Sequence, residues 1–221
     1  MSAVKLSTPI QSADLERLCI GDIVYLDGAL VTARDDVHHR HLRQGVPLPL
    51  DLAGLAIFHA GPIMQKTGAE RGGAESEDSA SWRVISIGPT TSMRMEQLEA
   101  EFIASTGIRL IVGKGGMGPK TADACRRHGA VHAVFPGGCA VLAAGRVEAV
   151  ERVEWLDLGM PEALWIMRVR DFGPLIVSID VRGNNLFENN KKAFAEQKEK
   201  ALAEICGTPG SARDGILHYM K

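Results

Sequence analysis

The sequence predicts one α/β domain over residues 1–221, built on a mixed or parallel sheet core that helices flank. Two observations support this fold class. Between residues 108 and 144, strand-like and helix-like segments alternate, which is the order that gives parallel strands joined by right-handed crossovers. In addition, 24 glycines in a chain that is 45% hydrophobic and 24% charged indicate an ordered protein with many tight turns.

The composition also excludes several classes of function. A formal net charge of -2 argues against a general nucleic-acid surface, because such a surface needs a basic patch. No apolar run approaches the roughly 20 residues that cross a bilayer, and the N-terminal residues lack the apolar core of a signal peptide. We therefore expect a cytoplasmic protein that binds neither nucleic acid nor membrane.

The four cysteines lie far apart in the chain, at Cys19, Cys125, Cys139 and Cys206, with no Cys-x-x-Cys pair. This spacing encodes neither a zinc knuckle nor an iron–sulfur run, so we expect reduced thiols in or near the core. Cys139 differs from the others because it follows two glycines at a strand-to-helix junction. Its role stays open.

Periodicity predicts four elements in the first part of the chain. They are a strand over 5–9, a helix over 12–18 with Ser12 as its N-cap, a hairpin over 23–33, and a helix from Asp35 to about Gln44 that stops at Gly45. The hairpin is predicted because Asp27-Gly28 stands between two apolar runs. In the next helix, His38 and His41 share a face without a third ligand, which favours a solvated face over a metal site.

The middle of the chain predicts two strands, a loop and a helix. A strand over 55–60 ends in Gly61-Pro62, residues 66–81 form a surface loop between hairpin strands, and a strand over 83–87 resumes the sheet. Past Arg94, apolar residues recur at helical spacing up to Gly107. The acidic residues of this helix, Glu96, Glu99 and Glu101, are expected to face outward.

The rest of the chain continues the alternation and then changes to strands. The expected elements are strands over 108–112 and 131–135, helices over 119–128 and 139–144, three strands over 151–155, 164–169 and 175–180, and a helix over about 187–206. The residues after Gly207 are expected to be loose at first.

Three strand-to-helix junctions each carry one cation close to the turn, namely Arg34, Arg94 and Lys114. Such a junction directs backbone N–H groups and the positive end of a helix dipole outward, which suits an anion. In open α/β sheets, ligands gather at the carboxyl ends of strands. The three cations together therefore predict a site for a small dianion, in which they bind carboxylates or phosphates.

A nucleotide-binding P-loop is the competing interpretation of the third junction. Its pattern places Lys-Ser/Thr directly after the last glycine, whereas Pro119 here stands between Gly118 and Lys120-Thr121. The proline removes an N–H from the phosphate cradle and shifts the lysine by one residue. Nucleotide binding is therefore disfavoured.

Thr90 and Thr91 have two interpretations that the residues alone leave open. Either hydroxyl can cap the helix after Pro89, although Ser92 competes for that role and no capping box is present. A hydroxyl beside Arg94, in a site built for anions, can instead handle a proton.

Six long motifs resemble one known family. They are Thr32-Ala-Arg-Asp35, Phe58-His-Ala-Gly-Pro62, Gly88-Pro-Thr-Thr-Ser-Met-Arg94, Val112-Gly-Lys-Gly-Gly-Met-Gly118, Leu158-Gly-Met-Pro-Glu162 and Phe172-Gly-Pro-Leu-Ile-Val-Ser-Ile-Asp180. In order, over nearly the whole chain, they are similar to the β subunits of L(+)-tartrate dehydratase and, more loosely, to the C-terminal domain of class I iron–sulfur fumarases. Two segments depart from that pattern, an enlarged loop over 70–81 and an insertion over 207–215.

The resemblance implies a swivelling β/β/α domain that pairs with a separate α subunit, as a heterotetramer of two α and two β subunits. The α subunit would carry an oxygen-sensitive 4Fe–4S cluster on three cysteines, and this chain alone would hold no metal. Carried over by motif, Arg34, Arg94 and Lys114 would bind substrate carboxylates. Thr90 would be the base that removes the C–H proton, and Thr91 would assist binding.

The activity that the resemblance implies is dehydration of a hydroxy-dicarboxylate, L(+)-tartrate to oxaloacetate and water. The alternative within this class is fumarase, which acts on malate or fumarate. An alternative from a different class is a stand-alone domain that binds dicarboxylates or other anions for regulation, without chemistry of its own. Partnership separates these hypotheses, because half an enzyme needs its α subunit.

Overall fold

The computed structural model describes residues 3–67 and 81–206 of the chain. Its contacts divide the chain into two units, residues 1–185 and residues 186–221. Most of the enlarged loop and the whole insertion expected at 207–215 lie outside the described residues. The first unit contains the three junctions, so it is the unit that matters for the site.

Seven strands form the main sheet of the first unit, in the order β1-β2-β3-β6-β7-β9-β8. They are β1 (Val4–Ser7), β2 (Ile23–Thr32), β3 (Ala56–Phe58), β6 (Leu110–Gly113), β7 (Val131–Val134), β8 (Val147–Glu154) and β9 (Leu164–Ile179). The strands from β1 to β7 in this order are parallel, whereas β9 is antiparallel to β7, β8 and β2. Because β9 pairs with both β7 and β2, five strands close into a ring.

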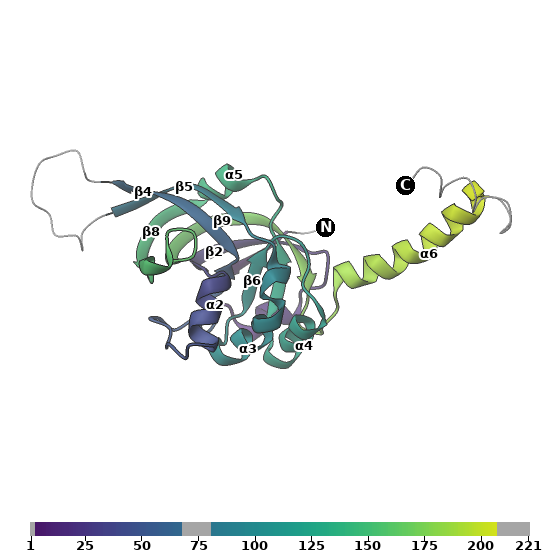
Figure 1. Cartoon of the computed structure of the whole chain (residues 1–221), viewed down its shortest axis with the longest axis horizontal. Helices are drawn as coiled ribbons and strands as arrows, with labels where there is room; N and C mark the ends of the chain where they lie inside the picture. Colours follow the sequence, from purple (N-terminus) through teal and green to yellow (C-terminus); the bar gives the residue numbers. More distant parts are fainter. Residues whose placement is uncertain (1–2, 68–80, 207–221) are drawn as a thin grey trace, which may run out of the picture. The chain divides into compact units, whose positions relative to one another are not determined.

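Three helices, α2 (Asp35–Leu42), α3 (Glu96–Thr106) and α4 (Pro119–His128), lie together on one side of this sheet (Figure 1). Alternation along the strands sorts the buried residues into two clusters. Phe58 of β3 packs in the cluster that contains Trp165 and Phe172 of β9, whereas its neighbour Ile57 packs in the cluster of Phe102 of α3. The predicted class, mixed α/β with a sheet core flanked by helices, is confirmed.

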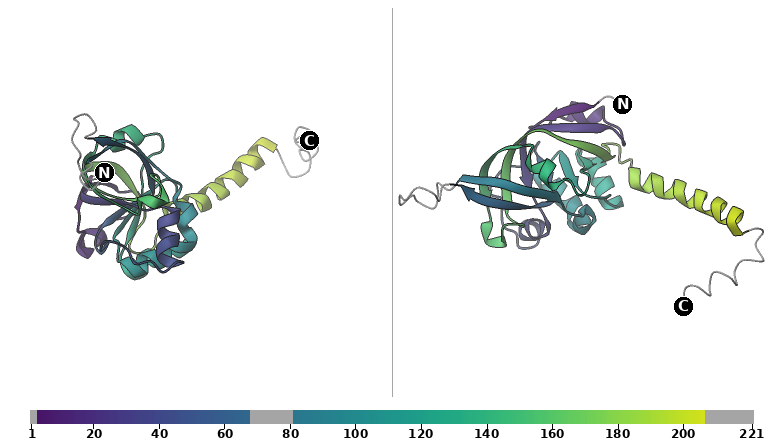
Figure 2. Two further views of the ribbon diagram at one scale, coloured as in Figure 1. Left: turned by 60° about the vertical axis from the view of Figure 1, so that its left-hand side comes forward. Right: turned by 90° about the horizontal axis from the view of Figure 1, so that it is seen from above.

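A separate two-stranded sheet consists of β4 (Ala60–Thr67) and β5 (Ser81–Pro89), and Figure 2 shows it as a ribbon distinct from the main sheet. The prediction that residues 83–87 resume the main sheet is therefore wrong. Gly61-Pro62 does not end a strand either, because both residues lie inside β4. The expected hairpin relationship is present, since β4 and β5 pair antiparallel.

The hairpin predicted at Asp27-Gly28 is also wrong, because β2 runs straight through these residues. The register of β2 against β9 shifts on both sides of Leu26, and Gly28 has a φ of +100°. A Cβ at Gly28 would overlap Thr8 Oγ1, which accepts a hydrogen bond from the N–H of Ala29 at 2.5 Å. The glycine thus permits a bulge and a close contact instead of a turn.

Three shorter predictions need adjustment. Helix α1 (Ser12–Glu16) has Gln11 as its N-cap, so Ser12 is its first helical residue and not its cap. Helix α2 ends at Leu42 instead of Gln44. The strands expected over 164–169 and 175–180 are one continuous strand, β9.

Helix α5 (Ala140–Ala144) and the short 3-10 helices η2 (Ser92–Met95) and η3 (Leu156–Leu158) complete the first unit. The second unit contains α6 (Leu186–Cys206), which matches the expected C-terminal helix. Within residues 3–67 and 81–206, no helix combines the length and apolar character needed to cross a membrane.

Candidate active site

The three cation-bearing junctions are linked to one another, two through their backbones and the third through an ion pair. The N–H of Lys114, after β6, donates to the carbonyl of Thr90 at 3.0 Å, and the N–H of Ser92 donates to the carbonyl of Lys114 at 3.0 Å. Arg94 in η2 in turn pairs with Asp35, the first residue of α2. The structure therefore links the turns that carry Arg34, Thr90, Thr91, Arg94 and Lys114, and their roles in a site stay predictions.

Arg34 is the N-cap residue of α2, and its side chain is only 16% exposed. Its Nη2 lies 3.0 Å from Glu162 Oε1, and its guanidinium crosses Gly61 so closely that a Cβ there would overlap Nη1. Burial raises the pKa of the Glu162 carboxyl. Arg34 is thus held in place by an acid from the turn before β9.

Thr32, two residues before Arg34, fixes that turn. Its buried hydroxyl donates to the carbonyl of Ala163 and accepts the N–H of Trp165, both at 2.9 Å. These bonds tie the end of β2 to the segment that carries Glu162. The Arg34–Glu162 pair therefore joins two segments that buried hydrogen bonds also connect.

Arg94 and Lys114 are more accessible. The Arg94 side chain is 52% exposed and binds Asp35 with two nitrogens, Nε to Oδ1 at 3.2 Å and Nη2 to Oδ2 at 2.9 Å. Lys114 is exposed, and no carboxylate of the described residues lies within 4.0 Å of its Nζ. Both arginines thus have an internal acid with which an incoming carboxylate would compete.

Thr90 is half-buried and Thr91 is exposed. Thr91 is the N-cap residue of η2, but its hydroxyl makes no capping bond. Across the part of the chain that the structure describes, neither threonine hydroxyl hydrogen-bonds to another residue. The capping interpretation is therefore not supported for these hydroxyls, and both stay available to a ligand.

The start of α4, in contrast, is filled by the protein itself. The Glu96 carboxylate accepts the N–H groups of Gly118 at 2.7 Å and Lys120 at 3.0 Å, and it accepts the Thr121 hydroxyl at 2.7 Å. The prediction that Glu96 faces outward is wrong, since it is only 7% exposed. At this junction the helix N-terminus binds an internal anion, and Lys114 alone remains for an external one.

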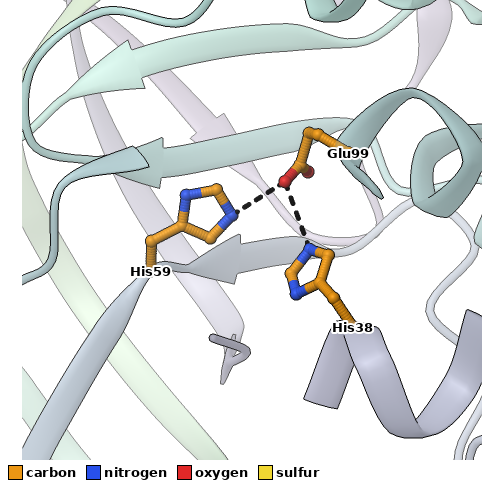
Figure 3. A group of neighbouring side chains, drawn as sticks. All are labelled: His38, His59 and Glu99. Atoms are coloured by element: carbon orange, nitrogen blue, oxygen red, sulfur yellow. Dashed lines mark hydrogen bonds and ion pairs between the residues drawn. The ribbon is translucent and has the colours of Figure 1, made fainter. Parts of the chain in front are cut away.

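His38, His59 and Glu99 meet in the interior beneath the junctions (Figure 3). Both His38 Nε2 and His59 Nε2 lie 3.1 Å from Glu99 Oε2, and all three side chains are fully buried. The predictions of an exposed Glu99 and a solvated face at His38 are therefore wrong. A signal for Glu99 existed, because it stands on the apolar stripe of α3, four residues after Met95 and three before Phe102.

His41, the other histidine weighed as a ligand, hydrogen-bonds instead to the carbonyl of Val46 and to Ser105. The free cysteines of the described residues occupy separate elements. Cys19 follows α1 and is exposed, Cys125 is buried in α4, and Cys139 precedes α5. Burial raises the pKa of the Cys125 thiol. These three thiols do not form a convergent set that fits an iron–sulfur cluster.

Comparison with known proteins supports the resemblance in the motifs. The family model described as Fumarase C-terminus matches residues 1–190. The L(+)-tartrate dehydratase subunit beta of Escherichia coli (strain K12) is 54% identical over 216 residues, which is 98% of each chain. A putative L(+)-tartrate dehydratase subunit beta of Methanocaldococcus jannaschii is 46% identical over 191 residues, 84% of this chain and 92% of the relative.

A longer relative extends the comparison. The putative fumarate hydratase class I of Geobacillus stearothermophilus is 38% identical over 194 residues, which is 88% of this chain but 35% of that protein. Both kinds of relative thus share the region that contains the three junctions. The chain belongs to the Fumarase C-terminus family, as a hydro-lyase β subunit of the tartrate dehydratase and class I fumarase type.

Proposed function

We propose that this chain acts with a cluster-bearing α subunit to dehydrate L(+)-tartrate to oxaloacetate and water. The observation that carries the proposal is the 54% identity to a tartrate dehydratase β subunit over 98% of both chains. The linked junctions support it, because two arginines and a lysine around two free hydroxyls suit a substrate with two carboxylates.

In this proposal, Arg34, Arg94 and Lys114 bind the two substrate carboxylates. An incoming carboxylate shares or replaces Glu162 at Arg34 and Asp35 at Arg94, whereas Lys114 is ready to bind. Thr90 first gives its hydroxyl proton to a carboxylate of the α subunit, and the resulting alkoxide takes the C–H proton, while Thr91 binds the substrate beside it. A threonine is a poor base unless its alkoxide is stabilised, and Arg94 and the start of η2 supply nearby positive charge.

The 4Fe–4S cluster of this enzyme class is proposed to lie on three cysteines of the α subunit, because the described thiols of this chain are dispersed. When bound, the cluster supplies the Lewis acid that helps the substrate hydroxyl to leave.

This chain closes over the site as a swivelling domain. The proposed assembly is a heterotetramer of two α and two β subunits. The free thiols suit the reducing conditions of the cytoplasm, the proposed location.

A class I fumarase is the second candidate, because the Geobacillus relative carries this region in a longer chain with a fumarate hydratase name. The residues proposed above serve malate or fumarate equally, since both substrates are dicarboxylates. Substrate preference therefore has to be measured.

The test is anaerobic co-expression of this chain with its α subunit, followed by turnover assays on L(+)-tartrate, malate and fumarate. We expect tartrate to be dehydrated with the highest kcat/KM, and we expect the β chain alone to be inactive without cluster iron. A higher kcat/KM for malate or fumarate favours the fumarase. Binding of dicarboxylates without turnover in any α–β complex would support the regulatory domain.

A further inference from the structure

Six buried polar side chains form a continuous chain of contacts beneath the three junctions, and the proposed chemistry uses none of them. We call them the buried polar chain; its members are His38, Glu99, His59, Ser92, His132 and Ser178, each fully buried. Its contacts are His38 Nε2 to Glu99 Oε2 at 3.1 Å, Glu99 Oε2 to His59 Nε2 at 3.1 Å, His59 Nδ1 to Ser92 Oγ at 3.0 Å, Ser92 Oγ to His132 Nε2 at 3.1 Å, and His132 Nδ1 to Ser178 Oγ at 2.6 Å.

The first members of this chain are each attached to a junction. His38 lies one helical turn after Arg34, and its Nδ1 contacts the carbonyl of Arg34 at 2.8 Å. Glu99 lies in α3, which continues directly from η2 and Arg94. The contact between His38 and Glu99 in Figure 3 therefore joins α2, which follows Arg34, to α3, which follows Arg94 of η2.

His59 connects the Thr90 turn to the buried polar chain, and Ser92 connects the Lys114 junction to it. The carbonyl of His59 accepts the N–H of Thr90 at 2.6 Å, so His59 holds the turn that carries the proposed base. Ser92 Oγ occupies space that only glycine leaves at position 113, because a Cβ there would overlap this oxygen. Gly113 immediately precedes Lys114. Each cation of the site is therefore connected, directly or through a neighbouring residue, to a member of the buried polar chain.

Stability alone is a weak reason for such an arrangement. Both histidines contact the same carboxylate oxygen, while Glu99 Oε1 has no hydrogen-bond partner among the described residues. The contact of His59 Nε2 also lacks hydrogen-bond geometry. Buried ionic groups are often replaced by apolar side chains without loss of stability, and a half-satisfied network is worse than an apolar core. A role in the site explains why an acid stands here.

Hydrogen-bond chemistry assigns the protons of His38 and allows a consistent pattern for the other two rings. The carbonyl of Arg34 can only accept, so His38 Nδ1 carries a proton, and its contact with the Glu99 carboxylate needs a second one on Nε2. His59 can meet Glu99 with an Nε2 proton and accept from the Ser92 hydroxyl at Nδ1. His132 can repeat this pattern between Ser92 and Ser178. Only His38 is then cationic, and its charge balances that of Glu99.

We propose that Glu99 is the positioning residue of the site. Its carboxylate binds the His38 imidazolium and the neutral His59 ring, and it thereby fixes the separation between Arg34 and the Thr90–Arg94 turn for a dicarboxylate. This inference rests on the proposed function for the identity of the dianion, but the protonation pattern that it requires does not.

The inference has a pH signature. The groups that face His38 are Glu99 from α3, His59 from the β3–β4 connection, and Asp35 on its own helix. Burial alone would lower the pKa of His38, but the Glu99 carboxylate, together with the Arg34 carbonyl and Asp35, outweighs burial and raises the pKa above its usual value. The contribution of the His38–Glu99 ion pair to holding the two helices together is complete below the pKa of His38 in the unfolded chain. It is lost as pH rises through the pKa of His38 in the folded protein. Affinity for the dianion should therefore fall on the alkaline side.

Nitrogen NMR of the histidine rings in the full ¹⁵N-labelled chain tests the protonation pattern without substrate. At pH 7 we expect two protonated ring nitrogens for His38 and one each for His59 and His132, the latter because burial lowers the pKa of His132 to about 3. In Glu99→Gln, His38 should become neutral. Glu101→Gln, on the surface of the same helix and paired with Arg43, should change no ring. A neutral His38 in the wild-type chain would overturn the inference.

Elemental analysis of the same sample guards against a different occupant. The donor atoms of His38, His59 and Glu99 lie within 4.8 Å of one another, which would also suit a divalent cation. We expect no stoichiometric metal in the purified chain. One bound metal ion per chain, with the rings of His38, His59 and His132 all neutral, would replace the proposed ion pair by a metal site.

Kinetics of the α–β complex separate positioning from folding. Glu99→Gln should raise the KM for the dicarboxylate at least tenfold, with kcat at saturation changed less than threefold, and it should move the alkaline limb of kcat/KM to lower pH. Glu99→Leu removes the same carboxylate and places an apolar side chain at this position, so folding no longer requires a buried charge there. A Glu99→Leu enzyme with wild-type KM would sink the positioning role. Absence of turnover in every complex would instead count against the proposed function, while the ring spectra still decide the proton pattern.

Discussion

Two helix starts with similar sequence patterns have opposite roles in this fold. At α4, the chain supplies its own anion, because Glu96 takes the N–H groups of Gly118 and Lys120 and the hydroxyl of Thr121. At η2, no side chain within residues 3–67 and 81–206 caps the start, and the Thr91 hydroxyl makes no capping bond. A strand, a glycine-rich turn and a helix therefore mark a possible anion site, but only an acid elsewhere in the chain decides whether the site is open.

The largest effect on turnover is expected at Thr90, beside the open start of η2. Thr90→Val keeps the shape and removes the oxygen, so kcat should fall by about 10² to 10⁴ with little change in substrate affinity. Thr91→Val is the matched control and should act mainly on KM. The measurement is turnover and solvent exchange of the substrate C–H in anaerobically reconstituted complexes. Normal exchange in Thr90→Val would assign the base to the α subunit.

At the closed start of α4, a substitution should instead change the stability of the protein. Glu96→Ala leaves several buried donors without their charged acceptor, so the free energy of unfolding should fall by roughly 2 to 4 kcal/mol. Urea denaturation of the β chain measures it, with Glu101→Gln as a control expected within about 0.5 kcal/mol of wild type. An unchanged midpoint for Glu96→Ala would show that water replaces the carboxylate and that the two starts differ less than their contacts indicate.

The three cations of the site should come next. Arg34→Ala, Arg94→Ala and Lys114→Ala each remove a charged hydrogen bond worth about 1.5 to 3 kcal/mol, so each should lower kcat/KM by roughly tenfold to a hundredfold. Stability should change much less for Arg94 and Lys114, since these side chains are exposed. Wild-type kinetics in all three variants would contradict the linked site.

The smallest effect is expected at Lys120, the lysine of the rejected P-loop pattern. It lies at the start of α4 and binds Gln97 on the surface, so Lys120→Ala should change kcat/KM less than about twofold. Steady-state kinetics beside Lys114→Ala make the comparison direct. A tenfold loss at Lys120 would show that the closed start also contacts the substrate.

Local sequence patterns predicted the parts of this fold that depend on neighbours in the chain. The alternating segment over 108–144 and the glycine that ends α3 follow from periodicity and capping. The positions of the three cations after strands were predictable for the same reason, whereas their binding role stays a prediction. Asp27-Gly28 misled, since the turn chemistry that makes hairpins also permits a bulge inside a long strand.

The remaining errors concern partners that are distant in the sequence. Glu99 binds a histidine 61 residues earlier, and Glu96 caps a helix that starts more than 20 residues later. Glu162, which holds Arg34, lies 128 positions beyond it. Helical periodicity assigns acids to the outer face by default, and only the folded contacts show which acids are held inside.

The overlap between Gly113 and Ser92 has a consequence for how this family can diverge. A Cβ at 113 would occupy the place of Ser92 Oγ and lie 3.2 Å from His59 Nδ1, so position 113 cannot gain a side chain while Ser92 stays. A lineage that gains a side chain at 113 must first lose the hydroxyl at 92, and with it the link between His59 and His132. The order of these two substitutions is therefore constrained, and homologues with a side chain at 113 should lack the hydroxyl at 92.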